Sequence, residues 1–362
     1  MRWSRILLAS AGFLGLAGLV LAVLPSRIDP VAWSPPVSPA LEGLLAPNEA
    51  LRGAHLVAPG QWPGPETVAL DTVGRLYAGC ADGLIRRTVG PQLAPATPNR
   101  VEVFADTGGR PLGMDFDASD ALIVADAVRG LLRISPAGEV ESLATQADGL
   151  PFGFTDDVKV GADGRYYFSD ASDRFGVGNY ELDLFEGRPH GRLLRYDPAT
   201  RTTEVLARDL YFANGVAVSP ELDFVLVNET YRYRISRLWL TGPRAGQLEV
   251  FADGLPGFPD GLSLGRDGRF YVALFTIRNG AADFTAGHPW MRSVLTKLPR
   301  ALWPKPERHG FVLALDEDGR PVQTWQDPGG ALLWEVTAAR RIGDRLYLGS
   351  LHNERGVAFL DL

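Results

Sequence analysis

The sequence predicts an all-β protein, a six-bladed β-propeller that follows an N-terminal transmembrane helix. Three observations lead to this fold class. The 362 residues include 41 glycines and 27 prolines, which suits a chain with frequent tight turns. One strand-turn-strand theme occurs six times, at spacings mostly near 45 residues. A long uncharged segment stands at the N-terminus, ahead of the first repeat.

The N-terminal segment is the first predicted element. After Arg2 and Arg5, residues 6–24 run for 19 positions without a charge, enough helix to cross the hydrocarbon layer. The positive flank predicts that everything after Pro25 lies on the extracytoplasmic side, periplasmic or lumenal. We expect residues 1–24 to be an uncleaved signal anchor, with a cleaved signal peptide as the alternative. Residues 25–51 are rich in proline and are expected to be a linker that lifts the domain off the bilayer.

The repeats are the second element, and they occupy residues 52–362. Each copy is an antiparallel hairpin, and most copies are followed by a second strand pair, so that four strands form one propeller blade. The copies begin at Pro65, Pro111, Asp156, Asn214, Asp260 and Glu335. The sixth copy lacks one outer strand before Leu362. We expect the segment at Ala54 to supply that strand and close the ring.

The longest irregular insert covers residues 276–309, within the fifth repeat. Its apolar residues follow a mostly helical spacing among arginines and lysines, which predicts a lid. We favour a helix packed on the propeller face. The alternative is a surface that also dips into the nearby membrane.

Polar residues occupy one equivalent position of the repeats, which we call the column. Four of them lie 11 residues before a hydrophobic residue of the second strand, namely Glu66, Asp156, Asn214 and Asp260, while Leu112 takes this place in the second repeat. Because the first strand of each blade lines the central channel, we expect these side chains to converge at the axis. Like charges brought together there would repel each other unless a cation neutralised them. Oxygen donors without histidine or cysteine favour calcium or magnesium, and a wide ring of carboxylates and carbonyls favours calcium.

Two further acidic residues, Asp157 and Glu335, could also belong to the column. Asp157 could face the axis in place of Asp156, because side chains alternate along a strand. Glu335 lies 12 residues before Tyr347, so it joins the column only if the last turn holds one extra residue. Otherwise Glu335 points into the blade packing or toward the rim.

Composition excludes several classes of protein. The net charge of −7, with both signs interspersed, argues against nucleic-acid binding and favours a small neutral or cationic ligand. The single cysteine, Cys80, rules out an intramolecular disulfide and is expected to be a buried strand residue. None of the five histidines has metal-binding spacing, and no nucleophile elbow, phosphate-binding loop or CxxC motif occurs. The sequence carries no signal for an oligomeric state.

Several motifs together resemble a known family over most of residues 50–362. They are GPE at Gly64, RPLG at Arg110, DDV at Asp156, YFSD at Tyr167, FANGVAVSP at Phe212, GFPDG at Gly257 and LYLGS at Leu346. In their order and spacing they resemble the strictosidine synthase-like branch of the calcium-dependent propellers, which also include paraoxonases and gluconolactonases. The resemblance implies a calcium ion held by Glu66, Asp156, Asn214 and Asp260.

The resemblance also implies a chemistry. Hydrolytic relatives use the ion to polarise an ester or lactone carbonyl and to activate water, with a carboxylate as base. Asp260 would combine the roles of ligand and base, and Glu335 matches the catalytic acid/base glutamate of strictosidine synthase. Two departures stand out: Leu112 replaces a channel-lining histidine of paraoxonases, and Asp156 replaces an asparagine. The added charge at Asp156 should tighten cation binding.

These features predict a calcium-dependent hydrolase that acts at the membrane surface. Its substrate is expected to be a small molecule, an ester or a lactone. The main alternative is a non-catalytic, calcium-stabilised propeller that binds a partner or lipid. A condensation of the strictosidine synthase type is the third reading.

Overall fold

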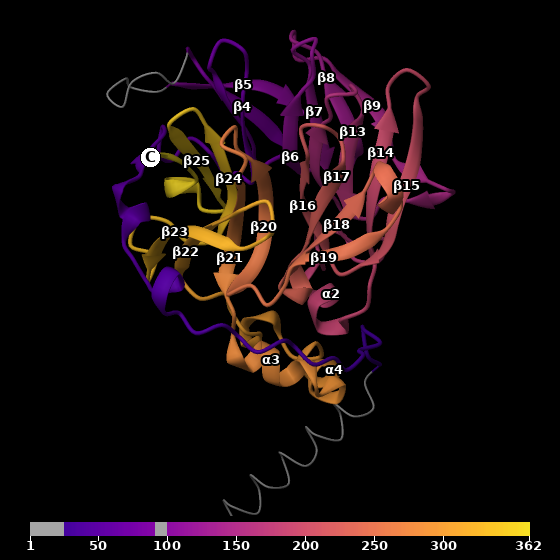
Figure 1. Cartoon of the computed structure of the whole chain (residues 1–362), viewed down its shortest axis with the longest axis vertical. Helices are drawn as coiled ribbons and strands as arrows, with labels where there is room; N and C mark the ends of the chain where they lie inside the picture. The colour runs from indigo at the N-terminus through magenta and orange to yellow at the C-terminus, as the bar shows by residue number, and fades with distance from the viewer. Residues whose placement is uncertain (1–24, 91–99) are drawn as a thin grey trace, which may run out of the picture.

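The computed structural model describes residues 25–90 and 100–362, and it confirms the predicted six-bladed β-propeller. Six four-stranded sheets surround a central axis, and the α-helices of the described residues lie at one end of the ring (Figure 1). The predicted transmembrane helix falls in residues 1–24, outside the described residues. Among the residues that are described, no helix is long and apolar enough to cross a membrane.

The first three blades follow each other along the chain. Blade 1 consists of β2 (Val68–Leu70), β3 (Leu76–Gly79), β4 (Leu84–Thr88) and β5 (Val101–Asp106). Blade 2 consists of β6 (Pro111–Phe116), β7 (Leu122–Asp126), β8 (Gly130–Ile134) and β9 (Val140–Ala144). Blade 3 consists of β12 (Thr155–Val160), β13 (Tyr166–Asp170), β14 (Gly191–Asp197) and β15 (Thr202–Leu210). A small hairpin, β10 (Gln146–Ala147) with β11 (Leu150–Pro151), separates blades 2 and 3.

The remaining blades complete the ring. Blade 4 consists of β16 (Ala213–Val218), β17 (Phe224–Glu229), β18 (Arg234–Trp239) and β19 (Leu248–Ala252). Blade 5 consists of β20 (Gly257–Leu264), β21 (Phe270–Ile277), β22 (His309–Leu315) and β23 (Pro321–Pro328). Blade 6 joins the two ends of the described chain: β24 (Val336–Ile342), β25 (Arg345–Ser350), β26 (Val357–Asp361) and β1 (His55–Leu56).

The ring closes through the N-terminal strand, as predicted. In β1, His55 pairs with Phe359 and Leu56 pairs with Ala358, both antiparallel. The segment at Ala54 therefore supplies the outer strand that the sixth repeat lacks, and β26 is not left as an unpaired edge.

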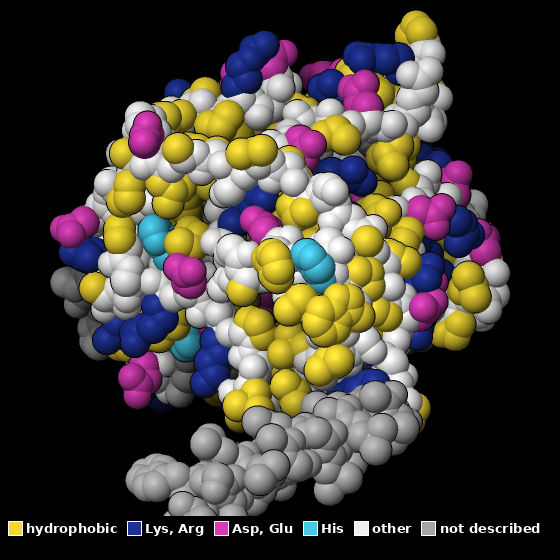
Figure 2. Space-filling view, turned by 90° about the horizontal axis from the view of Figure 1, so that it is seen from below, with side chains coloured by type: hydrophobic (Ala, Val, Ile, Leu, Met, Phe, Trp, Pro, Cys, Tyr) yellow, Lys and Arg dark blue, Asp and Glu magenta, His cyan; other side chains and the backbone are white. Residues whose placement is uncertain are grey.

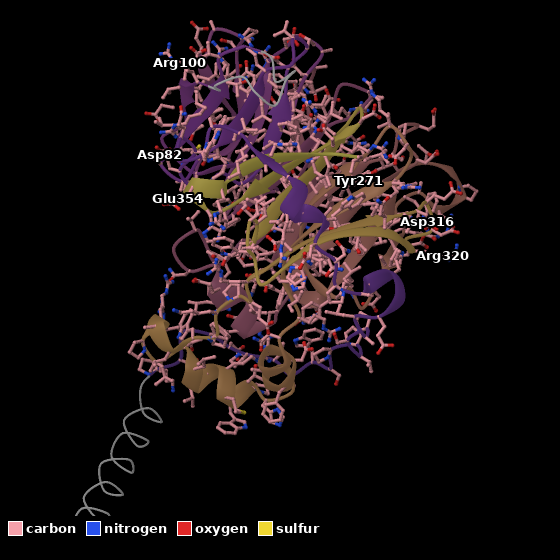
Figure 3. The ribbon with its side chains drawn as sticks, turned by 90° about the vertical axis from the view of Figure 1, so that its left-hand side faces the viewer. Asp82, Arg100, Tyr271, Asp316, Arg320 and Glu354 are labelled. Atoms are coloured by element: carbon pink, nitrogen blue, oxygen red, sulfur yellow. The ribbon has the colours of Figure 1, made fainter. Side chains whose placement is uncertain are left out.

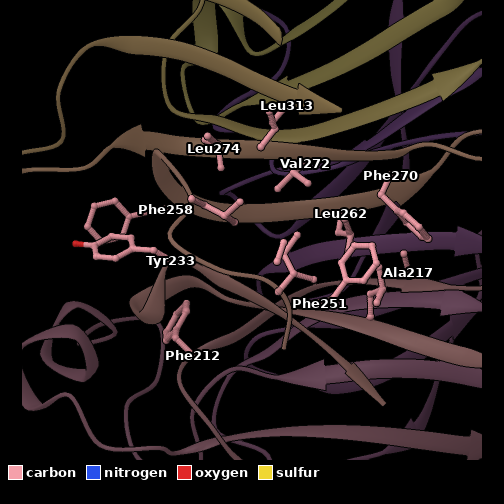
Figure 4. Close-up of a cluster of buried hydrophobic side chains, with 14 of the residues drawn as sticks. Phe212, Ala217, Tyr233, Phe251, Phe258, Leu262, Phe270, Val272, Leu274 and Leu313 are labelled. Atoms are coloured by element: carbon pink, nitrogen blue, oxygen red, sulfur yellow. The ribbon is translucent and has the colours of Figure 1, made fainter. Parts of the chain in front are cut away.

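The blades hold together by packing face to face. Figure 4 shows the largest cluster, where side chains of blade 4 meet those of blade 5. Phe251 meets Phe270 edge to face with ring centroids 5.5 Å apart, and Tyr233 meets Phe258 in the same way at 4.8 Å. Middle strands such as β7 and β13 are buried along their whole length, because both of their faces are covered by neighbouring blades. This explains why the hydrophobic residues that begin each of these strands follow one another without alternation.

Residues 25–51, expected to be a linker, lie against the propeller in the structure. The Val31 amide donates to the Glu186 carbonyl at 3.0 Å, and the Arg232 guanidinium stacks over the Trp33 ring at 4.1 Å. Two short 3-10 helices, η1 (Gly43–Leu45) and η2 (Ala50–Gly53), then run along β23. Leu51 of η2 is fully buried between blades 5 and 6. This segment is therefore part of the folded body.

Leu51→Ala tests how much this docking contributes to stability. Truncating a fully buried leucine is expected to lower the free energy of unfolding by about 2–5 kcal/mol. Urea unfolding measures the change, and Leu44→Ala in η1, where the side chain is 46% exposed, is the matched control. Equal effects of the two substitutions would contradict the docking of η2.

An α-helical insert interrupts blade 5 between β21 and β22. It contains α3 (Gly280–Ala286), α4 (Pro289–Leu295) and the 3-10 helix η5 (Arg300–Leu302), and it lies at one end of the molecule (Figure 3). The Asn279 side chain begins α3 by accepting hydrogen bonds from two backbone amides of its first turn, and Pro289 opens α4. Helix α2 (Glu181–Glu186) lies beside this insert and follows β13. The other short helices are η3 (Thr230–Arg232), η4 (Gly242–Arg244) and η6 (Asn353–Arg355).

Candidate metal-binding and catalytic site

A cavity of about 390 Å³ lies at the axis of the propeller, on the side of the helical insert. The four polar residues of the repeat column, Glu66, Asp156, Asn214 and Asp260, all line it. Its walls are mainly hydrophobic and include Leu112, Phe154, Tyr180, Phe212, Tyr231, Phe258 and Trp303. The four column residues therefore supply polar groups to a largely apolar chamber, an arrangement typical of small-molecule sites.

β-bulges bring the column residues together. The register of the inner strand shifts between Thr155 and Val158, between Ala213 and Val216, and between Pro259 and Leu262. Each bulge contains one residue of the column, namely Asp156, Asn214 and Asp260. A bulge breaks the alternation of side chains and re-aims one of them, so these three polar side chains can point along the channel.

The glycine after two of the column residues lets neighbouring inner strands approach closely. A Cβ on Gly215 would meet the Asp260 carbonyl oxygen at 2.4 Å, and one on Gly261 would meet the Thr337 carbonyl oxygen at 2.3 Å. The NG and DG pairs of the repeat thus do not form turns here. They allow strands β16, β20 and β24 to pack side by side around the axis.

The structure distinguishes Asp156 from Asp157. Asp156 borders the large cavity, whereas Asp157 borders only a narrow continuation of the channel on the other side. The Asp157 carboxylate accepts hydrogen bonds from Lys159 Nζ at 2.6 Å and from the Val216 amide at 2.8 Å. The Asp157 carboxylate is therefore engaged by partners within the protein, and Asp156 remains the candidate ligand.

Glu335 does not occupy the column position of blade 6. Thr337 does: it borders the narrow channel, and its Oγ1 donates to the Glu66 carbonyl at 2.6 Å. Glu335 lies two residues earlier, with a left-handed backbone φ of 48°, and its carboxylate contacts His352 Nε2 at 2.9 Å. Glu335 therefore lies outside the column but beside the site, where its charge adds to the burial that raises the pKa of Glu66 and of Tyr180.

The carboxylates of the site are costly to ionise. Burial raises the pKa of Asp156 and Asp260 well above the usual range, and the charge of Glu66 raises both further. Burial also raises the pKa of Glu66, although Arg110 opposes this effect. In the described part of the chain no hydrogen bond or ion pair reaches the Asp156 carboxylate, which is 5% exposed. A buried, unpartnered carboxylate fits a site for a cation.

The side-chain oxygens of the four column residues are of the kind that bind a hard divalent cation. Their present arrangement is not yet that of a coordination sphere. Across residues 25–90 and 100–362, no three acidic, histidine or cysteine side chains lie close enough together to coordinate a metal ion as they stand. Glu66 is engaged instead by Arg110, whose Nη2 lies 3.1 Å from Glu66 Oε2. Arg110 thus competes with an ion for the Glu66 carboxylate.

Sequence reasoning missed Arg110 and a second set of acidic residues that support the site. Asp126 accepts the Arg110 amide at 2.9 Å, Asp170 accepts the Phe154 amide at 2.9 Å, and Glu229 accepts the Tyr211 amide at 3.0 Å. Each acid ends the second strand of its blade and holds the backbone that leads into the inner strand. The signal was present in the repeats, since the second strands of blades 2, 3 and 4 end in Asp, Asp and Glu.

A buried acid on α2 lies beside the site. Asp183 is 1% exposed, and burial raises its pKa to about 7 despite a hydrogen bond with Ser172. The charge of Glu186 acts in the same direction, and that of His190 opposes it. Its neighbours on α2, Leu184 and Phe185, line the cavity. The protonation of Asp183 is therefore linked to the stability of one cavity wall.

Asp183→Asn tests this linkage. Because the pKa of Asp183 is higher in the folded than in the unfolded protein, its contribution to stability is complete below about pH 4 and is lost as pH rises through about 7. From pH 4 to 8 the wild-type free energy of unfolding should fall by roughly 3–4 kcal/mol more than that of Asp183→Asn. Denaturant melts at several pH values measure the two curves, and parallel curves would contradict the burial effect.

The comparisons with known proteins agree with this architecture. Family models match residues 43–88, as strictosidine synthase-like, N-terminal, and residues 156–243, as strictosidine synthase. The Arabidopsis thaliana protein strictosidine synthase-like 6 is 36% identical over 304 residues, which cover 83% of this chain and 80% of that protein. The chain belongs to the strictosidine synthase-like family. The human adipocyte plasma membrane-associated protein is 33% identical to this strictosidine synthase-like protein, over 97% of this chain and 88% of its own.

Solved structures share the fold of this strictosidine synthase-like protein. A gluconolactonase from Xanthomonas campestris superposes with a TM-score of 0.60 at 18% identity, covering 94% of this chain and 99% of that one. Regucalcin from Agrobacterium tumefaciens, described as a calcium-binding protein, superposes with a TM-score of 0.59 at 17% identity, covering 84% and 92%. At this level of identity the likeness concerns the fold.

Proposed function

We propose that the protein is a calcium-dependent hydrolase of esters or lactones that works at the extracytoplasmic membrane surface. The observation that carries the proposal is the buried, unpartnered Asp156 carboxylate, which lines a largely apolar cavity together with Glu66, Asn214 and Asp260. The gluconolactonase and regucalcin folds support the lactonase class and a divalent ion.

The residues of the cavity have separate roles in the proposed reaction. Glu66, Asp156, Asn214 and Asp260 would hold the ion, which would supply a Lewis acid for the substrate carbonyl and lower the pKa of water. The aromatic walls exclude bulk water and hold the apolar part of the substrate. Asp260 borders the cavity beside the other three ligands and would accept the proton of the attacking water. Glu335 does not line the cavity, so we assign the base to Asp260.

The test is an assay of the full chain in detergent micelles on phenyl acetate and a panel of lactones, with calcium and with chelator. The proposal expects turnover that chelator abolishes and calcium restores. Absence of turnover on every substrate, together with a melting temperature that chelator lowers, would overturn it in favour of the non-catalytic, calcium-stabilised propeller. Turnover that chelator leaves unchanged would remove calcium from the proposal.

A further inference from the structure

The helical insert presents large hydrophobic side chains to solvent. Phe284 of α3, Trp290 of α4 and Leu302 of η5 are 58%, 66% and 63% exposed. We call these three residues the insert patch. Hydrophobic side chains gather in the middle of the face that carries α3 and α4 (Figure 2). A group of exposed large apolar side chains on successive elements indicates an interaction surface, whereas single ones need no explanation.

The place where the chain enters the folded body indicates the partner. Ser26 Oγ lies 3.0 Å from Ser293 Oγ of α4, and Ile28 is buried in a cluster that includes Trp303 and Leu295. The chain therefore enters the body beside the insert patch. The preceding residues 6–24 carry 19 consecutive uncharged positions, the length that predicts insertion into a bilayer. A bilayer that held this segment would lie next to α3, α4 and η5.

Charge on the same face fits a lipid headgroup layer. Arg27 Nη2 and Arg300 Nη2 both donate to the Asn179 side-chain oxygen, at 2.7 and 3.2 Å, so two exposed guanidinium groups stand together near the insert. Lys305 is also exposed here. Basic residues around a tryptophan and other large apolar side chains are typical of surfaces that sit in the membrane interface, where the cations attract anionic lipids.

We propose that the insert patch is a second membrane contact, seated in the headgroup region of the bilayer that residues 6–24 are predicted to enter. The cavity is walled on this side by the same insert, through Trp303, Pro304, Lys305 and Pro306. Its mouth would then open at the bilayer surface. Resting on the proposed hydrolase activity, this defines the substrate class as lipophilic esters or lactones that partition into the membrane and reach the cavity from the lipid phase.

Spin labels test the contact independently of any activity. Cys80 is fully buried, so cysteines introduced one at a time by Phe284→Cys, Trp290→Cys and Leu302→Cys can be labelled selectively in the full chain. In vesicles of phosphatidylcholine with one fifth phosphatidylglycerol, all three labels should be more accessible to oxygen than to a water-soluble nickel chelate. Val73→Cys is the matched control, because Val73 is 61% exposed in the turn at the far end of the inner strand from Glu66. Labels on the patch that behave like the Val73 label would overturn the contact, and would leave a protein partner as its occupant.

A charge on the patch tests the route of the substrate. Trp290 does not line the cavity, so Trp290→Glu should leave turnover of soluble phenyl acetate unchanged while turnover of a long-chain ester in vesicles falls about tenfold. Leu44→Glu, at an exposed position on η1, is the control and should change neither rate. Equal rates of Trp290→Glu and wild type on the vesicle substrate would overturn the lipid route. Absence of turnover on both substrates in the wild type would instead count against the proposed hydrolase. The spin-label experiment would still test whether the insert patch contacts the membrane.

Discussion

Asp260→Asn is expected to lower kcat/KM for ester or lactone hydrolysis by about 10²–10⁴-fold. The substitution keeps the size of the side chain but removes its negative charge and its capacity to accept a proton. It also removes a charge whose burial, together with repulsion from Glu66 and Asp156, raises the pKa of Asp260. The variant should therefore fold, and without calcium it should melt at a higher temperature than the wild type.

A matched substitution separates the chemistry from the fold. Asp253→Asn lies in the same part of the chain but is exposed and does not border the cavity. We expect it to retain wild-type turnover and calcium affinity. Steady-state kinetics, calcium titration calorimetry and melting with chelator give the three readouts. Full activity of Asp260→Asn would exclude Asp260 as the base and, if calcium affinity were also unchanged, as a ligand.

Arg192→Ala is expected to lower the free energy of unfolding by about 3–5 kcal/mol at pH 8. Arg192 and Asp170 are 2% and 0% exposed, with Nη2 and Oδ2 2.6 Å apart. Removal of the guanidinium leaves a buried carboxylate without its cation. Burial already raises the pKa of Asp170 to about 6, and the loss of Arg192 should raise it further. Since the protonated acid needs no cation, the loss of stability should be smaller at pH 5 than at pH 8.

A surface pair on the same strand is the control for this second prediction. Arg195 of β14 bonds to Glu204, and their side chains are 27% and 60% exposed. Arg195→Ala should cost less than about 1 kcal/mol, because water screens an exposed ion pair. Urea unfolding of both variants at pH 5 and at pH 8 measures the four changes in free energy. Similar losses of stability for Arg192→Ala and Arg195→Ala would show that burial does not strengthen the contribution of the Arg192–Asp170 ion pair.

Repetition explains how much could be predicted from the sequence. Six copies of one hairpin, at spacings mostly near 45 residues, predicted a closed ring, and the strand missing from the last copy pointed to Ala54 as the closing segment. The same register identified Glu66, Asp156, Asn214 and Asp260 as neighbours in space. Hydrophobic patterning and repeat spacing are local properties of the sequence, so they could be interpreted without the structure.

Features that depend on contacts between distant segments could not be predicted in this way. The Arg110–Glu66 ion pair joins two blades, and the docking of Leu51 joins the N-terminal segment to blades 5 and 6. Asp157 and Asp156 could not be separated either, because a bulge cancels the alternation on which the prediction depended. The position of Glu335 was left open for the same reason: Thr337 takes the column position through another bulge.

The closure of the ring has a consequence for biosynthesis. β1 pairs with β26, about 300 residues further along the chain, so blade 6 cannot form until the last strand has been made and released. A nascent chain would carry five potential blades with an open seam, and its unpaired strand edges could associate with other chains in the meantime. Folding should therefore proceed under protection by chaperones until β26 emerges. Loss of the last few residues should prevent maturation more severely than an insertion of similar size in a surface turn.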